Sequence, residues 1–265
     1  MPSISVVLPA LALALLGGLL GAVAGRVVPL FRAYEPVPDG SQGPPPPQCP
    51  HCGTRVPWPR WTPLPARFAL TGRCADCATA VRAPAVVGVT AAAVLGGLAL
   101  LPGRSAVEIP AFAFLGVVGV VLAVVDARTH RLPNPLVLPA YPVALALLGA
   151  AALAVPDGGG RMLTALAGMA GVAAFYWVLW FIHPAGMGWG DVKLSGLLGL
   201  YLGWCSLGSA VSGTFAAFLF SACYGLVLIA LGRATRRSRI PFGPFMIAGA
   251  FAVIALGDPQ PALLG

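Results

Sequence analysis

The stretch AFAFLGVVGVVLAVVDARTH, residues 111 to 130, contains an apolar run that approaches the length of a membrane crossing. An aspartate, Asp126, follows directly at the end of this run. A second stretch, GMGWGDVKLSGLLGLYLGW at residues 186 to 204, places Asp191 just before another apolar run. A carboxylate held at the centre of a bilayer costs about 3 kcal/mol on insertion scales, and the whole chain has only 8 acidic residues. Two aspartates at the edges of apolar runs are therefore candidates for a function.

Composition predicts the fold class. Hydrophobic residues make up 58% of the chain and charged residues 9%, and the mean hydropathy is +0.88. These values exclude a soluble domain and indicate an all-α polytopic membrane protein. Since a helix needs about 20 apolar residues to cross the hydrocarbon core, we predict about eight transmembrane helices. Seven is the alternative, because the sixth run is short and a re-entrant start is possible there. The predicted spans are residues 5–29, 85–102, 109–126, 136–155, 162–182, 192–204, 208–231 and 241–257.

The basic residues predict the orientation, because loops rich in Lys and Arg stay in the cytoplasm. With the N-terminus outside, the first, third, fifth and seventh loops are cytoplasmic, and among the loop residues only Arg104 and Arg161 fall outside. The same assignment puts Asp126 and Asp191 on the cytoplasmic side. The net charge of +8 is thus interpreted as positive-inside topology, and no nucleic-acid partner is expected.

Three parts are predicted along the chain: a first transmembrane helix at residues 1–31, a cytoplasmic loop at 32–84, and a transmembrane core at 85–265. The loop, called the cysteine loop below, contains the linker GSQGPPPPQ at residues 40 to 48, which cannot be helical. No other loop is long enough to fold by itself.

The cysteine loop contains two Cys-x-x-Cys pairs, Cys49-Pro-His-Cys52 and Cys74-Ala-Asp-Cys77. Four thiolates in two such pairs are typical of a tetrahedral structural zinc site, and His51 is a possible substitute ligand. A redox dithiol and four cysteines without metal are the alternatives. Disulfides are disfavoured in a cytoplasmic loop, and a metal would supply the folding free energy that so small a segment lacks.

Each aspartate has a structural alternative. Asp126 can mark the cytoplasmic end of the third span, and Asp191 can be a helix N-cap. Asp191, however, follows three glycines at positions 186, 188 and 190, which allow close backbone approach or positive φ. Asp126 is followed by Pro133 and Pro135, which stop the helix at the membrane surface.

Two carboxylates in close contact cannot both ionise comfortably, so that one holds a proton while the other acts as a base on water. Such a pair titrates as a unit and supports aspartic proteolysis without a metal or a covalent intermediate. The sequence does not assign the acid and the base to one aspartate or the other.

Four motifs make the chain resemble the bacterial type IV prepilin peptidases, which are leader peptidases and N-methyltransferases. Their order along the chain covers about residues 45 to 250. The motifs are Cys49-Pro-His-Cys52 with Gly72-Arg-Cys74-Ala-Asp-Cys77, Asp126 with Leu132-Pro133-Asn134, Gly188-Trp-Gly190-Asp191-Val-Lys193-Leu, and Pro241-Phe-Gly243-Pro244.

The resemblance implies that Asp126 and Asp191 are the catalytic pair of an aspartic endopeptidase of the bacterial inner membrane. Such an enzyme cleaves the basic leader from prepilins or pseudopilins at the cytoplasmic face and then methylates the new N-terminal residue from S-adenosylmethionine. Pilus or secretion assembly proteins are possible further partners. The resemblance also implies residues that position the substrate or the backbone: Gly188, Gly190, Lys193, Pro241 and Gly243.

Two departures from the family pattern concern the second activity. Where the family tends to show Gly-Ser-Phe-x-Asn, this chain reads Gly21-Ala-Val-Ala-Gly-Arg26, and where it usually shows Tyr-Pro-x-x-Glu, this chain has no Glu after Arg82. A peptidase without methyltransferase activity is therefore one alternative. A transporter that uses the aspartates as ion sites and a scaffold that presents a zinc ribbon are the others. Glu35 and Lys193 are candidates, by position alone, for contacts with S-adenosylmethionine.

Overall fold

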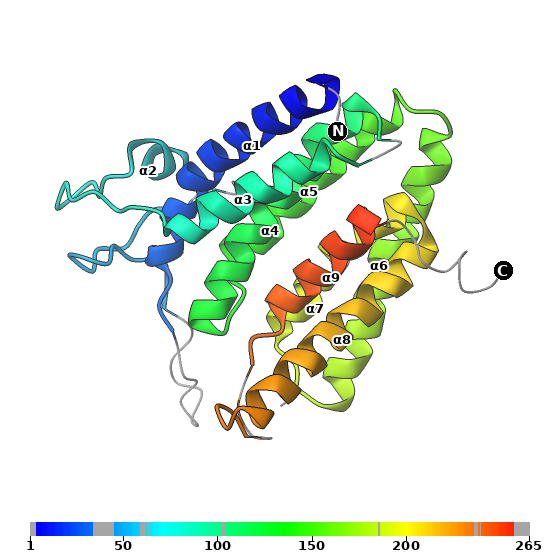
Figure 1. Ribbon diagram of the computed structural model, residues 1–265. Coiled ribbons are helices and arrows are strands. Elements are labelled where there is room, and N and C mark those ends of the chain that lie inside the picture. Colours follow the sequence, from blue (N-terminus) through cyan, green and yellow to red (C-terminus); the bar gives the residue numbers. More distant parts are fainter. Residues whose placement is uncertain are drawn as a thin grey trace. The chain divides into compact units, whose positions relative to one another are not determined.

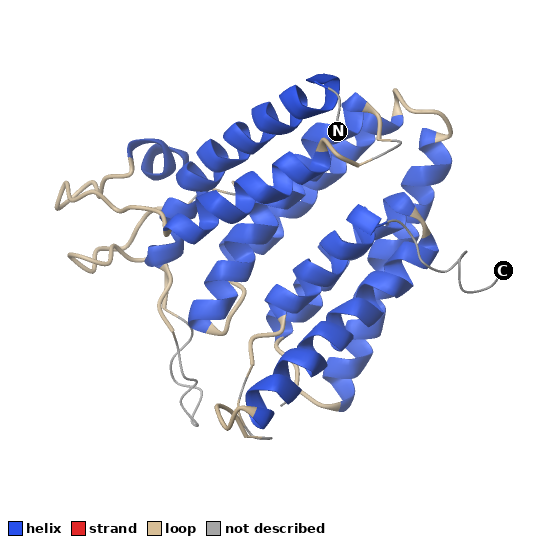
Figure 2. Ribbon diagram, in the orientation of Figure 1, coloured by secondary structure: helices blue, strands red, loops and turns tan. Residues whose placement is uncertain are grey.

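The computed structural model describes residues 4–33, 45–58, 62, 64–101, 104–184, 186–235, 238 and 240–256. Within these residues the regular structure is helical, apart from two isolated β-bridges in the cysteine loop (Figure 1 and Figure 2). Two short 3-10 helices are present, η1 (Gly25–Leu30) and η2 (Ala106–Glu108). The α-helices are α1 (Ile4–Ala24), α2 (Ala66–Thr71), α3 (Ala85–Leu98), α4 (Ile109–Thr129), α5 (Asn134–Ala152), α6 (Gly158–Ile182), α7 (Trp189–Cys205), α8 (Leu207–Ala230) and α9 (Gly243–Leu256).

The helices confirm the predicted all-α polytopic membrane fold. Each of the eight predicted spans contains one helix, and the short sixth span is the 17-residue helix α7. The apolar helices α3 and α9 have 14 residues each, or about 21 Å, which is shorter than a hydrocarbon core of about 30 Å. Among the described residues, five segments are long and apolar enough to cross a membrane: Val7–Leu30, Ala106–Thr129, Asn134–Ala152, Gly158–Ile182 and Leu207–Ala230.

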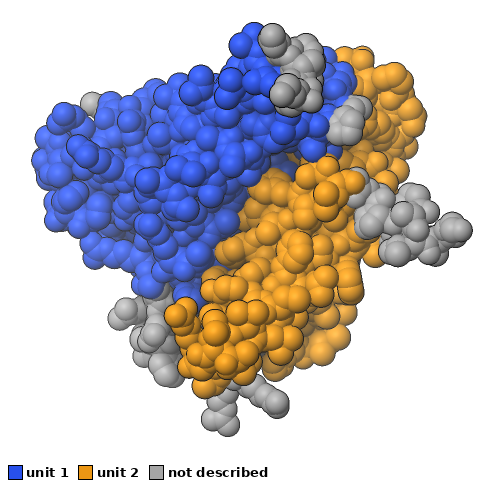
Figure 3. Space-filling view, viewed as in Figure 1, with its two compact units in different colours: residues 1–143 blue, residues 144–265 orange. Residues whose placement is uncertain are grey.

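The chain forms two compact units, Met1–Val143 and Ala144–Gly265 (Figure 3). The boundary falls within α5, which begins in unit 1 and continues in unit 2. The division predicted from membrane topology, with boundaries at residues 31 and 84, follows a different criterion and stays a prediction.

In unit 1, α1 packs closely on α3 through small residues (Figure 1). A Cβ added at Gly17 would lie 2.5 Å from the carbonyl oxygen of Ala91, and one added at Gly21 would lie 2.8 Å from the Ala91 side chain. Small residues allow such close approach between membrane helices. The side chains of Leu15 and Leu19 on α1 are exposed, as expected for residues that face lipid.

The cysteine loop is anchored to the end of the first span. In η1, the Arg26 side chain donates hydrogen bonds from Nη1 to the carbonyl oxygens of Ala69 (2.6 Å) and Leu70 (2.8 Å) in α2. These carbonyls belong to the last turn of α2 and have no partner within the helix. Gly72 then ends α2 in the left-handed region, with φ of 62°. The arginine that departs from the family pattern therefore has a structural role in this chain.

In unit 2, α7 is the central helix. It packs against α6, α8 and α9, and nearly all its residues from Asp191 onward are buried. A Cβ added at Gly199 would lie 2.5 Å from the carbonyl oxygen of Gly168 in α6, and one added at Gly203 would lie 2.5 Å from that of Thr164. The backbones of α6 and α7 are therefore in contact, and this contact positions the helix that begins with Asp191.

We predict that Gly199→Ala weakens unit 2, because its Cβ would overlap the backbone of α6. The expected loss in the free energy of unfolding is about 1–3 kcal/mol, as for other overpacked sites. Thermal unfolding of the detergent-solubilised protein measures it. Gly171→Ala, also on a membrane helix, is the control, because nothing lies within 4 Å of the added Cβ. Equal melting temperatures for the two variants would contradict the prediction.

Candidate active site

Asp126 lies in the last turn of α4 and is only 4% exposed. The helix ends because His130 adopts a left-handed conformation, with φ of 51°, and its N–H donates to the Asp126 carbonyl oxygen at 2.8 Å. Leu132 is buried in the turn that follows, and α5 begins at Asn134. The chain thus turns just beyond Asp126, but at His130 and before the predicted prolines, because the left-handed residue ends the helix first and Pro135 already lies in α5.

Arg131 connects this turn to the cysteine loop. Its Nη2 donates to the carbonyl oxygen of Pro45 at 3.2 Å, and its guanidinium lies 5.9 Å from the centre of the Phe31 ring. Burial lowers the pKa of Arg131, but a guanidinium stays charged at neutral pH. One side chain therefore holds the Asp126 end of α4 against both the end of η1 and the start of the described part of the cysteine loop.

Asp191 is the third residue of α7 and is 9% exposed. Its Oδ2 accepts a hydrogen bond from the Gly188 N–H at 3.2 Å, and its own N–H donates to the Gly188 carbonyl oxygen at 3.0 Å. Gly188, not Asp191, is the N-cap residue. The carboxylate nevertheless caps the amino terminus of α7, where the helix dipole favours negative charge.

The glycines before Asp191 do not adopt positive φ. The described glycines with positive φ are Gly53, Gly72 and Gly232, and Gly188 has φ of −70°. Of the two alternatives predicted for these glycines, close approach and positive φ, Gly188 therefore shows the first. The reason for a glycine at 188 is space, because a Cβ there would lie 3.1 Å from Asp191 Oδ2.

Aromatic side chains surround the amino-terminal end of α7. The Lys193 ammonium lies 5.5 Å from the centre of the Trp189 ring, and that ring packs at 4.7 Å on Trp180 of α6. The Asp191 carboxylate also interacts electrostatically with the phenol of Tyr176, a side chain of α6 that is fully buried.

The fourth predicted motif, Pro241–Pro244, packs on Tyr176 of the same region. Phe242, between Pro241 and Gly243, packs at 6.1 Å on Tyr176 and at 5.1 Å on Phe218 of α8. Gly243 is buried at the start of α9. Unit 2 therefore packs the Pro241–Pro244 loop on Tyr176, the same tyrosine that interacts electrostatically with Asp191.

Asp126 belongs to unit 1 and Asp191 to unit 2. Their pairing in one active site is a proposal. Of the two residues considered for S-adenosylmethionine, Lys193 lies two positions beyond Asp191, and Glu35 lies outside the described residues.

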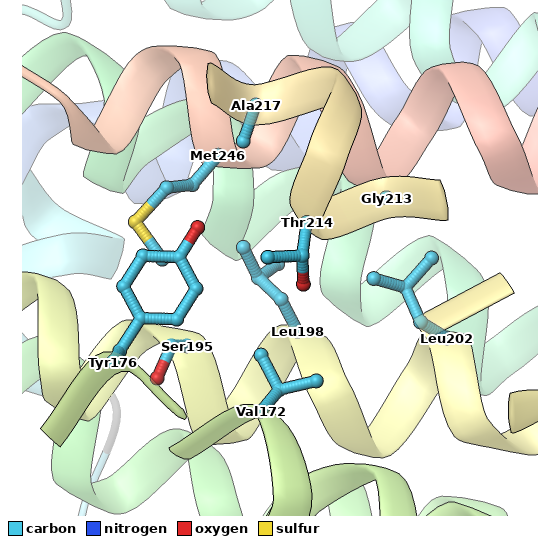
Figure 4. A pocket seen from close by; sticks show the side chains of 9 residues that line it. All are labelled: Val172, Tyr176, Ser195, Leu198, Leu202, Gly213, Thr214, Ala217 and Met246. Atoms are coloured by element: carbon cyan, nitrogen blue, oxygen red, sulfur yellow. The ribbon is translucent and has the colours of Figure 1, made fainter. Parts of the chain in front are cut away.

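A small cavity lies behind Tyr176 in the interior of unit 2 (Figure 4). Its volume is about 10 Å³, and a single water requires about 10–15 Å³. The cavity holds at most one water molecule and cannot hold a substrate. It is lined by Val172, Tyr176, Ser195, Leu198, Leu202, Gly213, Thr214, Ala217 and Met246.

The four predicted cysteine ligands form one cluster. The Sγ atoms of Cys49 and Cys77 are 3.9 Å apart, those of Cys52 and Cys74 are 3.7 Å apart, and all four lie within 4.8 Å of one another. A tetrahedral zinc ion with Zn–S bonds of 2.3 Å requires sulfur atoms about 3.8 Å apart. The cluster therefore fits zinc, and His51 is exposed outside it.

Each cysteine pair closes a similar turn. The Cys49 N–H donates to the Thr54 carbonyl oxygen at 2.8 Å, and the Cys74 N–H donates to that of Thr79 at 3.1 Å. The Thr54 hydroxyl lowers the pKa of the Cys52 thiol to about 6, and that of Thr79 lowers the pKa of Cys77. Burial raises the pKa of Cys49 to about 11. Each turn thus combines a buried cysteine with a more accessible one that ionises readily and binds metal as the thiolate.

Sequence reasoning missed three residues that organise these sites. Tyr176 stands in an apolar helix, where an aromatic residue carries no signal of function. In the sequence, Arg26 indicates no role, and Arg131 indicates only the membrane orientation. Their hydrogen bonds to distant carbonyl groups become visible only in the fold.

Comparisons with known proteins identify the family. Residues 113–230 match the model of the type IV leader peptidase family, and residues 15–101 match that of the bacterial peptidase A24 N-terminal domain. No solved structure matches the chain significantly.

The chain is 32% identical to a prepilin leader peptidase/N-methyltransferase of Burkholderia pseudomallei, over 82% of this chain and 69% of that protein. Proteins of the same name from Bacillus subtilis and Pseudomonas aeruginosa are 29% and 27% identical, over 79% of this chain and 81% and 71% of their own lengths. This chain belongs to the type IV leader peptidase family.

Proposed function

We propose that this protein is an aspartic endopeptidase of the bacterial inner membrane that removes the basic leader from type IV prepilins or pseudopilins. The observation that carries the proposal is the position of Asp126 and Asp191. Each is a buried carboxylate at the end of an apolar helix, in a chain that belongs to the leader peptidase family. The cytoplasmic orientation of both ends rests on the positive-inside distribution of basic residues.

In the proposed reaction the ionised aspartate takes a proton from water, and the oxygen of that water attacks the carbonyl carbon of the scissile bond. The protonated aspartate donates its proton to the carbonyl oxygen. The tetrahedral intermediate then collapses, the C–N bond breaks, and the leaving nitrogen takes a proton from the dyad. No metal is needed for these steps.

The two helix ends support a division of these roles. The Asp191 carboxylate accepts a backbone N–H at the amino terminus of α7, where the helix dipole favours an anion. Asp126 lies in the last turn of α4, where the dipole disfavours one. We therefore assign the water-activating base to Asp191 and the proton donor to Asp126.

Prepilins fit this site as substrates. Their hydrophobic segment would lie in the bilayer, and their basic leader would project to the cytoplasm. Gly188, Gly190 and Lys193 at the start of α7, with Pro241 and Gly243 before α9, are proposed to position the extended cleavage segment. Pilus or secretion assembly proteins are further proposed partners.

We predict that Asp126→Asn and Asp191→Asn each reduce leader cleavage by about 10²–10⁴-fold or more, since each removes one partner of the acid–base pair. The measurement is cleavage of a membrane-embedded prepilin by the purified protein. Asp157→Asn is the matched control: Asp157 is exposed, precedes α6 with left-handed φ of 49°, and Asn tolerates that conformation. Cleavage by both active-site variants at the wild-type rate would exclude the proposed mechanism.

We further propose that the same protein methylates the new N-terminal residue. The support is the name N-methyltransferase of the relatives. In this step the lone pair of the neutral amine attacks the methyl carbon of S-adenosylmethionine. The S–CH₃ bond breaks, its electron pair stays on sulfur to give S-adenosylhomocysteine, and the amine releases a proton to solvent. Mass spectrometry of the cleaved pilin detects one methyl group in place of one hydrogen.

The cysteine cluster is proposed to hold a structural zinc ion. We predict one zinc per purified chain and its loss in Cys49→Ser and Cys74→Ser, with proteolytic sensitivity of the cysteine loop rising in parallel because metal binding drives its folding. Elemental analysis and limited proteolysis measure the two effects. Cys223→Ser, an exposed cysteine on α8 outside the cluster, should keep the metal. Full zinc content in both cluster variants would refute the assignment.

A further inference from the structure

The cysteine loop contains a cleft of about 700 Å³, within the size range of pockets for small molecules and cofactors. It lies between the two cysteine turns and α2, which Figure 1 shows together at one end of unit 1. This loop cleft is lined by Thr54, Arg55, Val56, Pro57, Pro65, Phe68, Thr71, Arg73, Cys74, Ala75, Asp76 and Ala78.

The loop cleft has an apolar floor and a charged rim. Val56 and Phe68 are buried at 8% and 7% exposure, and they form the floor. The rim carries two guanidinium groups and one carboxylate, from the exposed residues Arg55, Arg73 and Asp76. The two arginines come from different cysteine turns, so folding of both turns is needed to bring their charges to one cleft.

We propose that the loop cleft binds S-adenosylmethionine. The assignment rests on the methyltransferase half of the proposed function. Arg55 and Arg73 on the rim together receive the carboxylate of the methionine part, Asp76 receives its ammonium group, and the adenine ring lies on the floor at Val56 and Phe68. Guanidinium groups pair with carboxylates through two parallel hydrogen bonds, which gives both strength and orientation.

The methyl donor S-adenosylmethionine can bind only where water reaches the protein. S-adenosylmethionine carries a sulfonium, an ammonium and a carboxylate, and charged groups of this kind are expelled from hydrocarbon. Its site must therefore lie in a part of the chain that water reaches, and the cysteine loop is the largest such part predicted from the sequence. The interior cavity of unit 2, about 10 Å³ in volume, is far too small.

Hydrogen bonds connect the loop cleft to the end of α4. The N–H of Val56 on the cleft floor donates to the Pro47 carbonyl oxygen at 3.0 Å, and two residues earlier the Pro45 carbonyl oxygen accepts from Arg131 Nη2. Arg131 lies five positions beyond Asp126. The donor cleft is thereby held to the same end of α4 that carries Asp126, which is the end where the new amine is released.

Hydrogen bonds from Arg26 fix α2, which forms one wall of the cleft. Phe68 and Thr71 of α2 line the cleft, and Arg26 bonds the carbonyl groups of Ala69 and Leu70 between them. Arg73 also donates from Nη1 to the carbonyl oxygen of Ala78 at 3.3 Å. This bond holds its guanidinium on the rim and leaves other N–H groups to reach a ligand.

The test measures binding of radiolabelled S-adenosylmethionine to the purified full-length protein by equilibrium dialysis, with zinc content checked in every sample. Arg55→Ala and Arg73→Ala should each weaken binding by about 10-fold or more, as expected for loss of a charge-assisted hydrogen bond. When the concentration of S-adenosylmethionine limits the reaction, these variants should also methylate a smaller fraction of the cleaved pilin. Arg82→Ala is the matched control, an exposed arginine of the same loop outside the cleft.

Competition distinguishes the donor from other anions and adenine compounds. S-adenosylhomocysteine should displace the label, whereas ATP and vesicles of anionic lipid should not. Displacement by ATP or by vesicles at similar concentrations would overturn the proposal, as would wild-type binding in both arginine variants with zinc retained. Absence of binding to the wild type would overturn it too.

The two proposals fail in distinguishable ways. If the wild type methylates, and Arg55→Ala and Arg73→Ala bind S-adenosylmethionine and methylate as well as the wild type, the binding site lies elsewhere in the chain. The proposed function is then retained. Binding that depends on these arginines without methylated product would retain the site and remove the methyltransferase activity.

Discussion

A carboxylate in hydrocarbon carries a large free-energy penalty, and the placement of the two candidate catalytic aspartates in this chain follows from that constraint. A membrane helix satisfies its backbone hydrogen bonds internally except at its ends. At these ends, unpaired N–H and C=O groups and water are available to stabilise a charged side chain. Asp126 occupies the last turn of α4 and Asp191 the first turn of α7. Their burial is tolerated because each is at such an end.

Close helix packing supports this arrangement. Apolar side chains alone do not determine which helices pack together in lipid. Small residues determine it, because they let two helix backbones approach closely. In unit 2 the contact of Gly199 with Gly168 holds α7 against α6. Tyr176, two turns beyond Gly168 along α6, then packs on Phe242 and interacts electrostatically with Asp191. A carboxylate on a packed helix end keeps its direction better than one on a free loop, which suits acid–base chemistry.

The sequence predicted the helices and the clustering of the four cysteines well, for physical reasons that are local. The apolar run predicted as residues 109–126 is part of α4, Ile109–Thr129, and the short run at 192–204 lies within α7, Trp189–Cys205. The spacing of the four cysteines predicted a cluster that the fold closes. Features that depend on distant contacts were not predictable. Gly188 provides space for a carboxylate three residues away, and Arg26 and Arg131 bond carbonyl groups 43 and 86 positions distant. No periodicity or motif encodes such partners.

The metal cluster and the loop cleft share structure, and this has a thermodynamic consequence. Cys74 is both a member of the cluster and part of the cleft wall, and Thr54, Ala75 and Asp76 lie within two positions of a cysteine ligand. A metal that orders the two turns therefore also sets the distance between Arg55 and Arg73. By linkage, a ligand that bridges these arginines stabilises the same folded turns and strengthens metal retention. The proposed zinc would then have a role beyond folding, because its binding would assemble a charged cleft from a segment too small to form one alone.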